Sequence, residues 1–399
     1  GMCDRPDNYY ASAVILHWER SRRGDMNIDR VAIIEGDNNP SQIQVPFVSE
    51  VGPIPFDMQA EFVSARTIAE TESVTGMCFL ESECFEDCKS QEDAGENGYI
   101  STTALSGSPT NVANVWYTED RGETWHQTSA NPFAAAVDIS DVIISGTKKN
   151  HRIIVSSGTS NPGSPAQVAY ADVTAIGNTD WVTVNVGSKN GQFVTKLYML
   201  DWMHVYALTN DGYIYKSADG GSTWIAVYSS GTANLLDING TRNGTLWAVG
   251  EDAVILKSTD YGASWDAVAS PSLADITSVC VTPDGTVIIG DSIGAIFGSY
   301  DDGAEWTTLQ LQGISAASVK KIRSWGDSDI WVIANTSAGG KVLRSVDGGA
   351  SFRLWNLNIP ANSGLNALFV VDPNIVFVGG DPHGGTAFVS KTISNIVGF

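Results

Sequence analysis

Short apolar runs separated by turn-forming residues recur along most of the chain, and no segment shows a long helical period. One unit reads as four short strands: ITSVCVTP, TVIIGDS, AIFGSY and EWTTLQL. The second strands of comparable units, HVYALT, LWAVG, IWVIA and IVFVGG, are apolar on both faces. Such strands are covered by sheets on either side. The pattern therefore predicts an all-β fold of repeated four-stranded units.

One eight-residue phrase, Ser-x-Asp-x-Gly-x-x-aromatic, recurs at the third turn of these units, and we call it the box turn. Its clearest copies are SADGGSTW at 217–224, STDYGASW at 258–265 and SYDDGAEW at 299–306. TEDRGETW at 118–125 and SVDGGASF at 345–352 are variants, and QVAYADVTAIGNTDWVTV contains a degenerate copy that ends at Trp181. Successive copies from 224 to 352 are roughly 40 residues apart, a spacing typical of propeller blades.

Each conserved type of residue in the box turn has a structural explanation. The carboxylate is expected to accept hydrogen bonds from nearby amides, the glycine to adopt a positive φ, and the aromatic to pack between adjacent sheets. Carboxylates spread around a rim do not meet at one catalytic point. We therefore assign structural roles to Asp120, Gly122, Trp125, Trp181, Asp219, Gly221, Trp224, Asp260, Gly262, Trp265, Asp301, Gly303, Trp306, Asp347, Gly349 and Phe352.

A four-stranded unit of this size is too small to bury both faces alone, and stacking units around an axis solves the problem. Six units end at these aromatics, and LNALFVV, NIVFVGG and TAFVSKT supply three strands of a seventh. The sequence thus predicts a seven-bladed β-propeller over 41–399 after an N-terminal extension, 1–40. We expect 41–50 to be the closing strand and 60–115 to form an elaborated first blade. The alternative places AVILHW and RVAIIEG in an eighth blade.

Composition excludes several classes of protein. The 399 residues are 43% hydrophobic and 17% charged, which is ordinary for a globular chain. A formal net charge of -22 repels phosphate backbones, so nucleic acid is not an expected partner. No apolar run is long enough to span a bilayer, and membrane insertion is not expected.

Candidate chemistry is sparse. Cys78, Cys84 and Cys88 lie close together in MCFLESECFEDC, where free thiols, one local disulfide and a bound metal all remain open, although the spacing matches no familiar zinc pattern. No two histidines form a local metal pair, and GGDPHGG, which contains His383, lacks the following helix of a phosphate loop. No Gly-x-Ser-x-Gly elbow is present. We predict no catalytic residue, cofactor or metal site.

With its repeated box turns, the region 115–399 resembles the BNR or Asp-box repeat proteins. This group includes sialidases, xyloglucanase-type glycoside hydrolases, sortilin-like receptors and photosystem II stability and assembly factors. The resemblance implies a propeller but not a single activity, because enzymes and binding proteins share the motif.

The enzymes of this group carry features that the chain lacks. The sialidases have an Arg-Ile-Pro phrase and a carboxylate-gripping cluster of three arginines, and neither is evident among the few arginines here. Xyloglucanase-type enzymes place two carboxylates in a cleft between two propellers, whereas this chain has room for one propeller. Assembly factors bind proteins through a basic patch, and no arginine cluster is evident in the sequence.

The leading hypothesis is a non-catalytic binding or structural propeller whose partner is a protein or a glycan. Surface, assembly-factor and virion or phage-tail components fit it, so an extracellular, cell-surface or virion location is favoured. A xyloglucanase-like or sialidase-like glycoside hydrolase is the alternative. Ligand identity, the propeller face that is used and the oligomeric state stay open at this point.

Overall fold

The computed structural model describes residues 13–20, 26–34, 61–68, 73–80, 95–103, 113–133, 137–147, 150–158, 164–231, 233–312, 318–355, 359–383 and 386–393. The chain divides into two compact units, Gly1–Gln59 and Ala60–Phe399. In the first unit, β1 (Ala13–Arg20) pairs with β2 (Met26–Ile34) as an antiparallel hairpin. None of the described residues is helical, so none belongs to a membrane-spanning helix.

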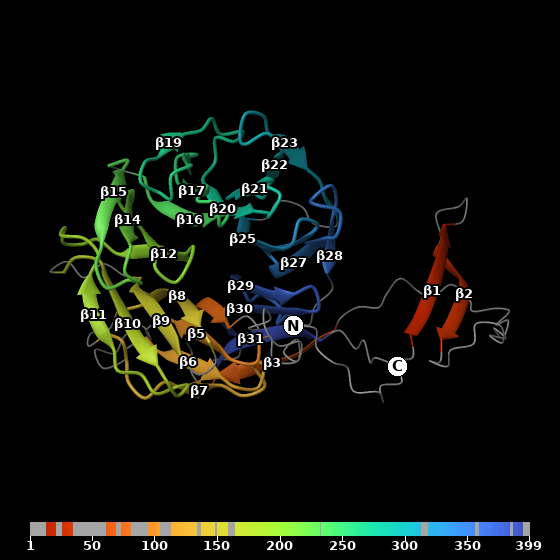
Figure 1. The fold of residues 1–399 in the computed structure, drawn as a ribbon, viewed down its shortest axis with the longest axis horizontal. Helices are drawn as coiled ribbons and strands as arrows, with labels where there is room; N and C mark the ends of the chain where they lie inside the picture. The colour runs from red at the N-terminus through yellow and green to blue at the C-terminus, as the bar shows by residue number, and fades with distance from the viewer. Residues whose placement is uncertain are drawn as a thin grey trace, which may run out of the picture. The chain divides into compact units, whose positions relative to one another are not determined.

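The second unit is a seven-bladed propeller of antiparallel four-stranded sheets arranged around a central axis (Figure 1). The first strands of neighbouring blades contact one another all around the ring, which shows that the first strand of every blade is the innermost one.

The strands of the first four blades have the following bounds, from the inner to the outer edge. Blade 1 consists of β4 (Val74–Phe79), β5 (Gly98–Thr102), β6 (Val115–Thr118) and β7 (His126–Gln127). Blade 2 consists of β8 (Ile139–Gly146), β9 (His151–Ser157), β10 (Gln167–Val173) and β11 (Val182–Asn185). Blade 3 consists of β12 (Val194–Met199), β13 (Val205–Thr209), β14 (Tyr213–Ser217) and β15 (Ile225–Ser229). Blade 4 consists of β16 (Leu235–Gly240), β17 (Leu246–Gly250), β18 (Ile255–Ser258) and β19 (Asp266–Ala267).

The last three blades follow the same order. Blade 5 consists of β20 (Ile276–Val281), β21 (Val287–Asp291), β22 (Ile296–Ser299) and β23 (Thr307–Leu309). Blade 6 consists of β25 (Ser318–Trp325), β26 (Asp329–Thr336), β27 (Gly339–Ser345) and β28 (Phe352–Trp355), with β24 (Leu311–Gln312) added parallel to β28. Blade 7 consists of β29 (Leu365–Asp372), β30 (Ile375–His383), β31 (Thr386–Ile393) and β3 (Glu61–Ile68).

The ring closes where β3 pairs antiparallel with β31, so an early and a late segment of the chain share blade 7. A closing strand from the N-terminal side was predicted, but the structure gives this position to β3, whereas residues 41–50 lie outside the described residues. The segments proposed for an eighth blade form β1 and β2, which pair only with each other among the described strands. The described fold therefore has seven blades.

The core of the propeller lies between the blades. Seven hydrophobic clusters each combine residues of two neighbouring blades, one cluster for each interface. The second strands β13, β17 and β21 are buried at every position, as their two-faced apolar pattern predicted. Trp247 and Trp331, in second strands, are among the largest fully buried side chains.

Candidate functional site

The five clear box turns share one hydrogen-bond pattern. In the turn at 217–224, Ser217 Oγ donates to Asp219 Oδ1 at 2.8 Å and accepts from the Gly221 amide at 2.8 Å. Asp219 Oδ1 also accepts from the Thr223 amide at 2.8 Å. Equivalent bonds surround Asp120, Asp260, Asp301 and Asp347. Each carboxylate thus holds its own hairpin together.

The glycines and the pKa values of the box turns agree with this geometry. Gly122, Gly221, Gly262, Gly303 and Gly349 all have φ between 71° and 90°, where a side chain is disfavoured. The hydroxyl and amide of Ser264 donate to Asp260 and, with the hydroxyl of Ser258, lower the pKa of that carboxyl to about 2. The box carboxylates are therefore ionised and already bonded.

The aromatics that end the box turns pack between blades. Trp265 contacts the cluster formed by blades 3 and 4, and Trp306 contacts that of blades 4 and 5. Trp125, Trp181 and Trp224 occupy the equivalent interfaces, and Phe352 is fully buried between blades 5 and 6. In the degenerate copy, the Trp181 indole donates to the carbonyl of Ala130 at 2.8 Å.

The inner strands carry a second repeated feature, one that no recurring phrase in the sequence marks. Each of the seven has a register shift near its start, across the second residue of the strand in six of them and across the third residue in β25. A bulge of this kind re-aims the side chains that follow it. The residues that directly follow this shift form what we call the bulge ring: Gly76, Asp141, Lys196, Asp237, Ser278, Lys321 and Ala367.

Unlike the box turns, the bulge ring is not uniform: glycine, alanine, serine, aspartate and lysine all occur at equivalent positions. Gly76 and Ala367 give blades 1 and 7 a small residue, whereas blades 2, 3, 4 and 6 carry charges. Lys196 Nζ lies 2.6 Å from Asp141 Oδ2, and this carboxylate also accepts from the Leu197 amide at 3.1 Å. Charged contacts therefore link blades 2 and 3 at the axis.

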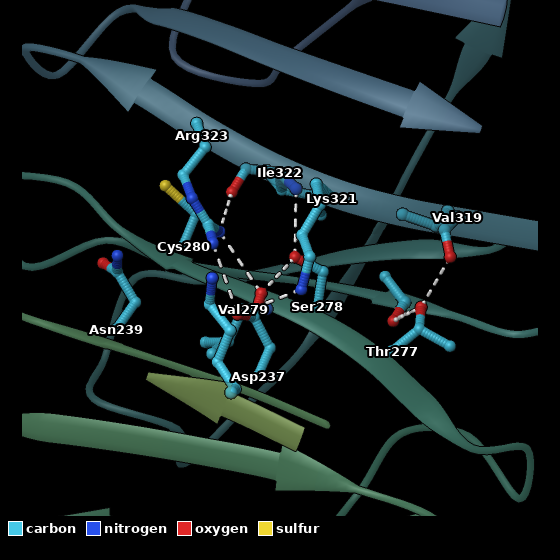
Figure 2. A network of polar contacts seen from close by, with 12 residues as sticks. Asp237, Asn239, Thr277, Ser278, Val279, Cys280, Val319, Lys321, Ile322 and Arg323 are labelled. Atoms are coloured by element: carbon cyan, nitrogen blue, oxygen red, sulfur yellow. Dashed lines mark hydrogen bonds and ion pairs between the residues drawn. The ribbon is translucent and has the colours of Figure 1, made fainter. Parts of the chain in front are cut away.

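Asp237 is the centre of a larger network, which Figure 2 shows in detail. Its side chain has no exposed surface and accepts hydrogen bonds from Ser278 Oγ at 2.6 Å and from the Val279 amide at 3.2 Å. Lys321 Nζ lies 3.4 Å from Asp237 Oδ1, and the Arg323 guanidinium donates to both carboxylate oxygens at 3.2 and 3.3 Å. One carboxylate therefore serves two cations.

The pKa values of the network follow from this imbalance. Burial opposes ionisation of Asp237, but Arg323, Lys321 and Lys196 outweigh it and hold the carboxyl pKa well below its usual range. Burial lowers the pKa of Lys321 to about 8, with Lys196 and Arg323 acting in the same direction against the attraction of Asp237. The sharing of one carboxylate by two cations is therefore accompanied by a lowered pKa of Lys321.

A cavity of about 470 Å³ occupies the axis beside the bulge ring. Four cationic side chains line it, namely Lys196, Arg242, Lys321 and Arg323. The carboxylates that line it are Asp141, bound to Lys196, and Asp201, whose Oδ2 lies 2.7 Å from His204 Nδ1. Its wall is thus basic in a chain whose net charge is -22.

The other side of the cavity is apolar. Leu80 and Phe79 of the first blade line it, together with Phe369 and Val370 of β29. The small residues Gly76 and Ala367 of the bulge ring lie on this side, in blades 1 and 7. The cavity therefore has a charged wall and an apolar wall.

The box turns and the connections between first and second strands share one face of the propeller, the box face. Backbone bonds join them: Gly220 donates to Met203, Tyr261 to Gly244, and Gly348 to Ser328. Six of the eleven exposed large hydrophobic side chains among the described residues lie on this face. They belong to blades 3 to 6: Trp202, Met203, Tyr261, Tyr300, Trp325 and Val346.

The remaining sequence candidates are scattered. Cys78 and Cys280 are buried free thiols, so Cys78 forms no disulfide, and Cys84 and Cys88 lie outside the described residues. His383 ends β30, at the pairing with Thr386. Arg344 binds Asp329 and stacks on Trp331 and Trp355. Arg152 binds Asp172 at 2.6 Å. The described residues contain no cluster of potential metal ligands.

The basic wall corrects one interpretation of the sequence. No arginine cluster is evident along the chain, yet the fold brings Arg242 and Arg323 to one cavity with Lys196 and Lys321. These residues come from three blades, and no local motif connects them. Lys196 and Lys321 directly follow the bulge of an inner strand. Arg323 lies two residues further along β25 and Arg242 follows the end of β16, so the four share no common sequence position.

Comparisons with known proteins support the fold. No protein-family model and no curated protein matches the sequence. Among solved structures, YCF48 bound to D1 peptide matches with a TM-score of 0.61 and 16% identity over 84% of this chain and 96% of that chain. YCF48 from Cyanidioschyzon merolae matches with a TM-score of 0.60 and 15% identity over 84% and 99%. The WD40 β-propeller domain of Doa1 follows at 0.59 and 12%, over 83% and 96%. The chain is thus similar to propellers that include a peptide-bound one.

Proposed function

We propose that this chain is a non-catalytic protein-binding propeller of the Asp-box type, and that its partner contacts the box face over blades 3 to 6. The observation that carries the proposal is the concentration of exposed apolar side chains on that face, led by Trp202, Tyr300 and Trp325. Exposed aromatics are enriched at protein interfaces, where they bury large areas at small entropic cost. Blades 7, 1 and 2 have no such residue on their described part of the face.

The neighbouring structure adds support. YCF48 has been solved with a bound peptide, so a propeller similar to this one binds a segment of another protein. The repeated box turns also match a group that contains binding proteins as well as enzymes. The basic cavity beside the aromatic face gives a partner polar contacts to complement the apolar ones.

The same geometry disfavours the glycoside hydrolase alternative. Such an enzyme needs one carboxylic acid that stays protonated as the general acid. Asp237 is held ionised by Arg323 and Lys321, and Asp141 is bound to Lys196. The carboxylates nearest the axis therefore act as partners of cations.

The test uses a library of random displayed peptides selected on the full chain. We expect the selected peptides to lose binding to a Trp202→Ser, Tyr300→Ser, Trp325→Ser variant by tenfold or more. The matched control replaces Leu273 and Ile293 with serine, because these residues are at least as exposed but lie in connections of the opposite face. Equal peptide binding by both variants would refute the proposal, as would exclusive binding on a glycan array.

A further inference from the structure

The wall of the axial cavity contains one more buried positive charge than its carboxylate neutralises. Asp237 is the shared partner of Lys321 and Arg323, whose side chains are only 18% and 20% exposed. The neighbouring pair is balanced, because Lys196 binds Asp141 one to one. An unbalanced charge in such a place costs desolvation energy that no protein group offsets.

Arg242 adds a further cation at the same place. It lies in the connection after β16 and lines both the axial cavity and an adjoining groove, as Arg323 does. Among the described residues it forms no ion pair and no hydrogen bond through its side chain. A guanidinium without a partner, next to a cation pair that shares one carboxylate, is an arrangement suited to an anion.

The charge to be balanced and the shape of the cavity narrow the choice of anion. Among the buried groups of the wall the deficit is a single charge, which a carboxylate group matches, and the exposed Arg242 adds a cation beside it. The guanidinium fork of arginine fits a carboxylate through two parallel hydrogen bonds. The opposite wall, with Phe369, Val370 and Leu80, suits an apolar group attached to that carboxylate.

Building on the proposed function, we propose that the axial cavity binds a carboxylate group of the protein partner, through Arg242, Arg323 and Lys321, with an adjacent apolar group against Phe369. The bound carboxylate would be the counter-charge that Asp237 does not provide for both cations. The expected ligand is therefore a peptide segment that has a carboxylate next to an apolar group.

Proton linkage follows from the position of Lys321. The charged groups that act on it come from three other inner strands and from its own: Asp237 of β16, Lys196 of β12, Asp141 of β8 and Arg323 of β25. With the pKa of Lys321 near 8 in the free protein, the bound anion favours the protonated amine. Affinity should therefore be full below pH 7 and decline as pH rises through 8.

The experiment titrates the full chain with hexanoate at low ionic strength, at pH 6.5 and pH 9.5, and follows the heat of binding. We expect affinity to fall roughly tenfold between the two pH values, with proton uptake near pH 8. Arg242→Gln should weaken binding at least tenfold without a folding defect, because Arg242 is exposed. Arg353→Gln, on an exposed position of β28, is the matched control and should bind as the parent does.

Two further arms decide what is bound. Lys321→Arg should keep affinity at pH 6.5 and lose the pH dependence, since a guanidinium stays charged at pH 9.5. Inorganic phosphate should bind more weakly than hexanoate. Binding that is insensitive to Arg242→Gln, a pH-independent affinity, or a preference for phosphate would overturn the inference.

Failure of this inference is separable from failure of the proposed function. The Trp202→Ser, Tyr300→Ser, Trp325→Ser variant should bind hexanoate like the parent while losing the displayed peptides. If that variant loses the displayed peptides but the parent does not bind hexanoate, the proposed binding face is supported and the carboxylate site is refuted.

Discussion

The box turns and the bulge ring solve the same local problem in different surroundings. In both, a serine hydroxyl donates to a carboxylate and accepts from a backbone amide: Ser217 with Asp219 in a box turn, and Ser278 with Asp237 at the axis. The box turn is local, exposed and repeated in five blades. The axial version joins blades 4, 5 and 6, is buried, and occurs only once among the described residues.

This difference separates architecture from specificity. A feature copied around a ring does the same job in each blade, and here it closes a hairpin and directs an aromatic into the interface. A position whose residue type varies between blades has a role that depends on where in the ring it lies. The bulge ring varies from Gly76 to Lys321 at equivalent sites, and that variation creates a cavity with one basic and one apolar side.

The sharpest test makes one chemical change in both regions. Asp237→Asn should destabilise the fold by about 3–5 kcal/mol, because it leaves two cations without their buried carboxylate. Asp219→Asn in a box turn should cost only about 1 kcal/mol, since water reaches that exposed side chain. Urea unfolding of the full chain measures both. Equal losses would show that the two regions do not differ as described.

A control separates the loss of charge balance from damage to packing. Asp237→Asn combined with Lys321→Met should recover part of the lost stability, because it removes one of the two unpaired cations. If the double variant loses as much stability as the two single variants together, the loss in Asp237→Asn does not come from the unpaired cations.

The features that could be predicted from the sequence are the repeated ones, and those that could not are the ones that vary between blades. The repeated phrase predicted the fold, the number of blades and the turn in which each copy lies. Cations such as Lys196, Arg242 and Lys321 were missed, because each is unremarkable within its own strand. The sequence predicted 41–50 as the closing strand; that segment lies outside the described residues, and among the described strands β3 (Glu61–Ile68) pairs with β31. Pro46 lacks an amide for pairing, which weighs against the first segment.

The second prediction concerns the aromatics of the box turns. Trp265→Ala should destabilise the propeller by about 3 kcal/mol, because the indole packs in the cluster between blades 3 and 4. Tyr300→Ala, within a box turn but exposed, should change stability by less than about 0.5 kcal/mol. Thermal unfolding of both variants checks this pair. Similar losses of stability in the two variants would mean that the aromatic at the end of the turn does not stabilise the interface between blades.

The third prediction uses the pH dependence of the axial network. The pKa of Lys321 is lowered in the folded protein from 10.5 to about 8, so between these values the unfolded chain binds more protons. The folded state therefore gains stability as pH rises from 8 to 10, by about 1–2 kcal/mol from this group. The stability of the parent minus that of Lys321→Met should rise over this window. A flat difference would show that Lys321 titrates normally.

The smallest contrast is between the two serines. Ser278→Ala should cost about 2 kcal/mol, because Asp237 and the Ile322 amide both lose a partner where the carboxylate has no exposed surface. Ser217→Ala removes the same two bonds from Asp219 and the Gly221 amide, but the exposed carboxylate regains its partner from water. We expect a cost of about 1 kcal/mol there. Chemical denaturation resolves such a gap when both variants keep the parent's denaturant slope. A larger loss for Ser217→Ala would mean that the repeated turn, and not the axial network, is the more sensitive part of the blade.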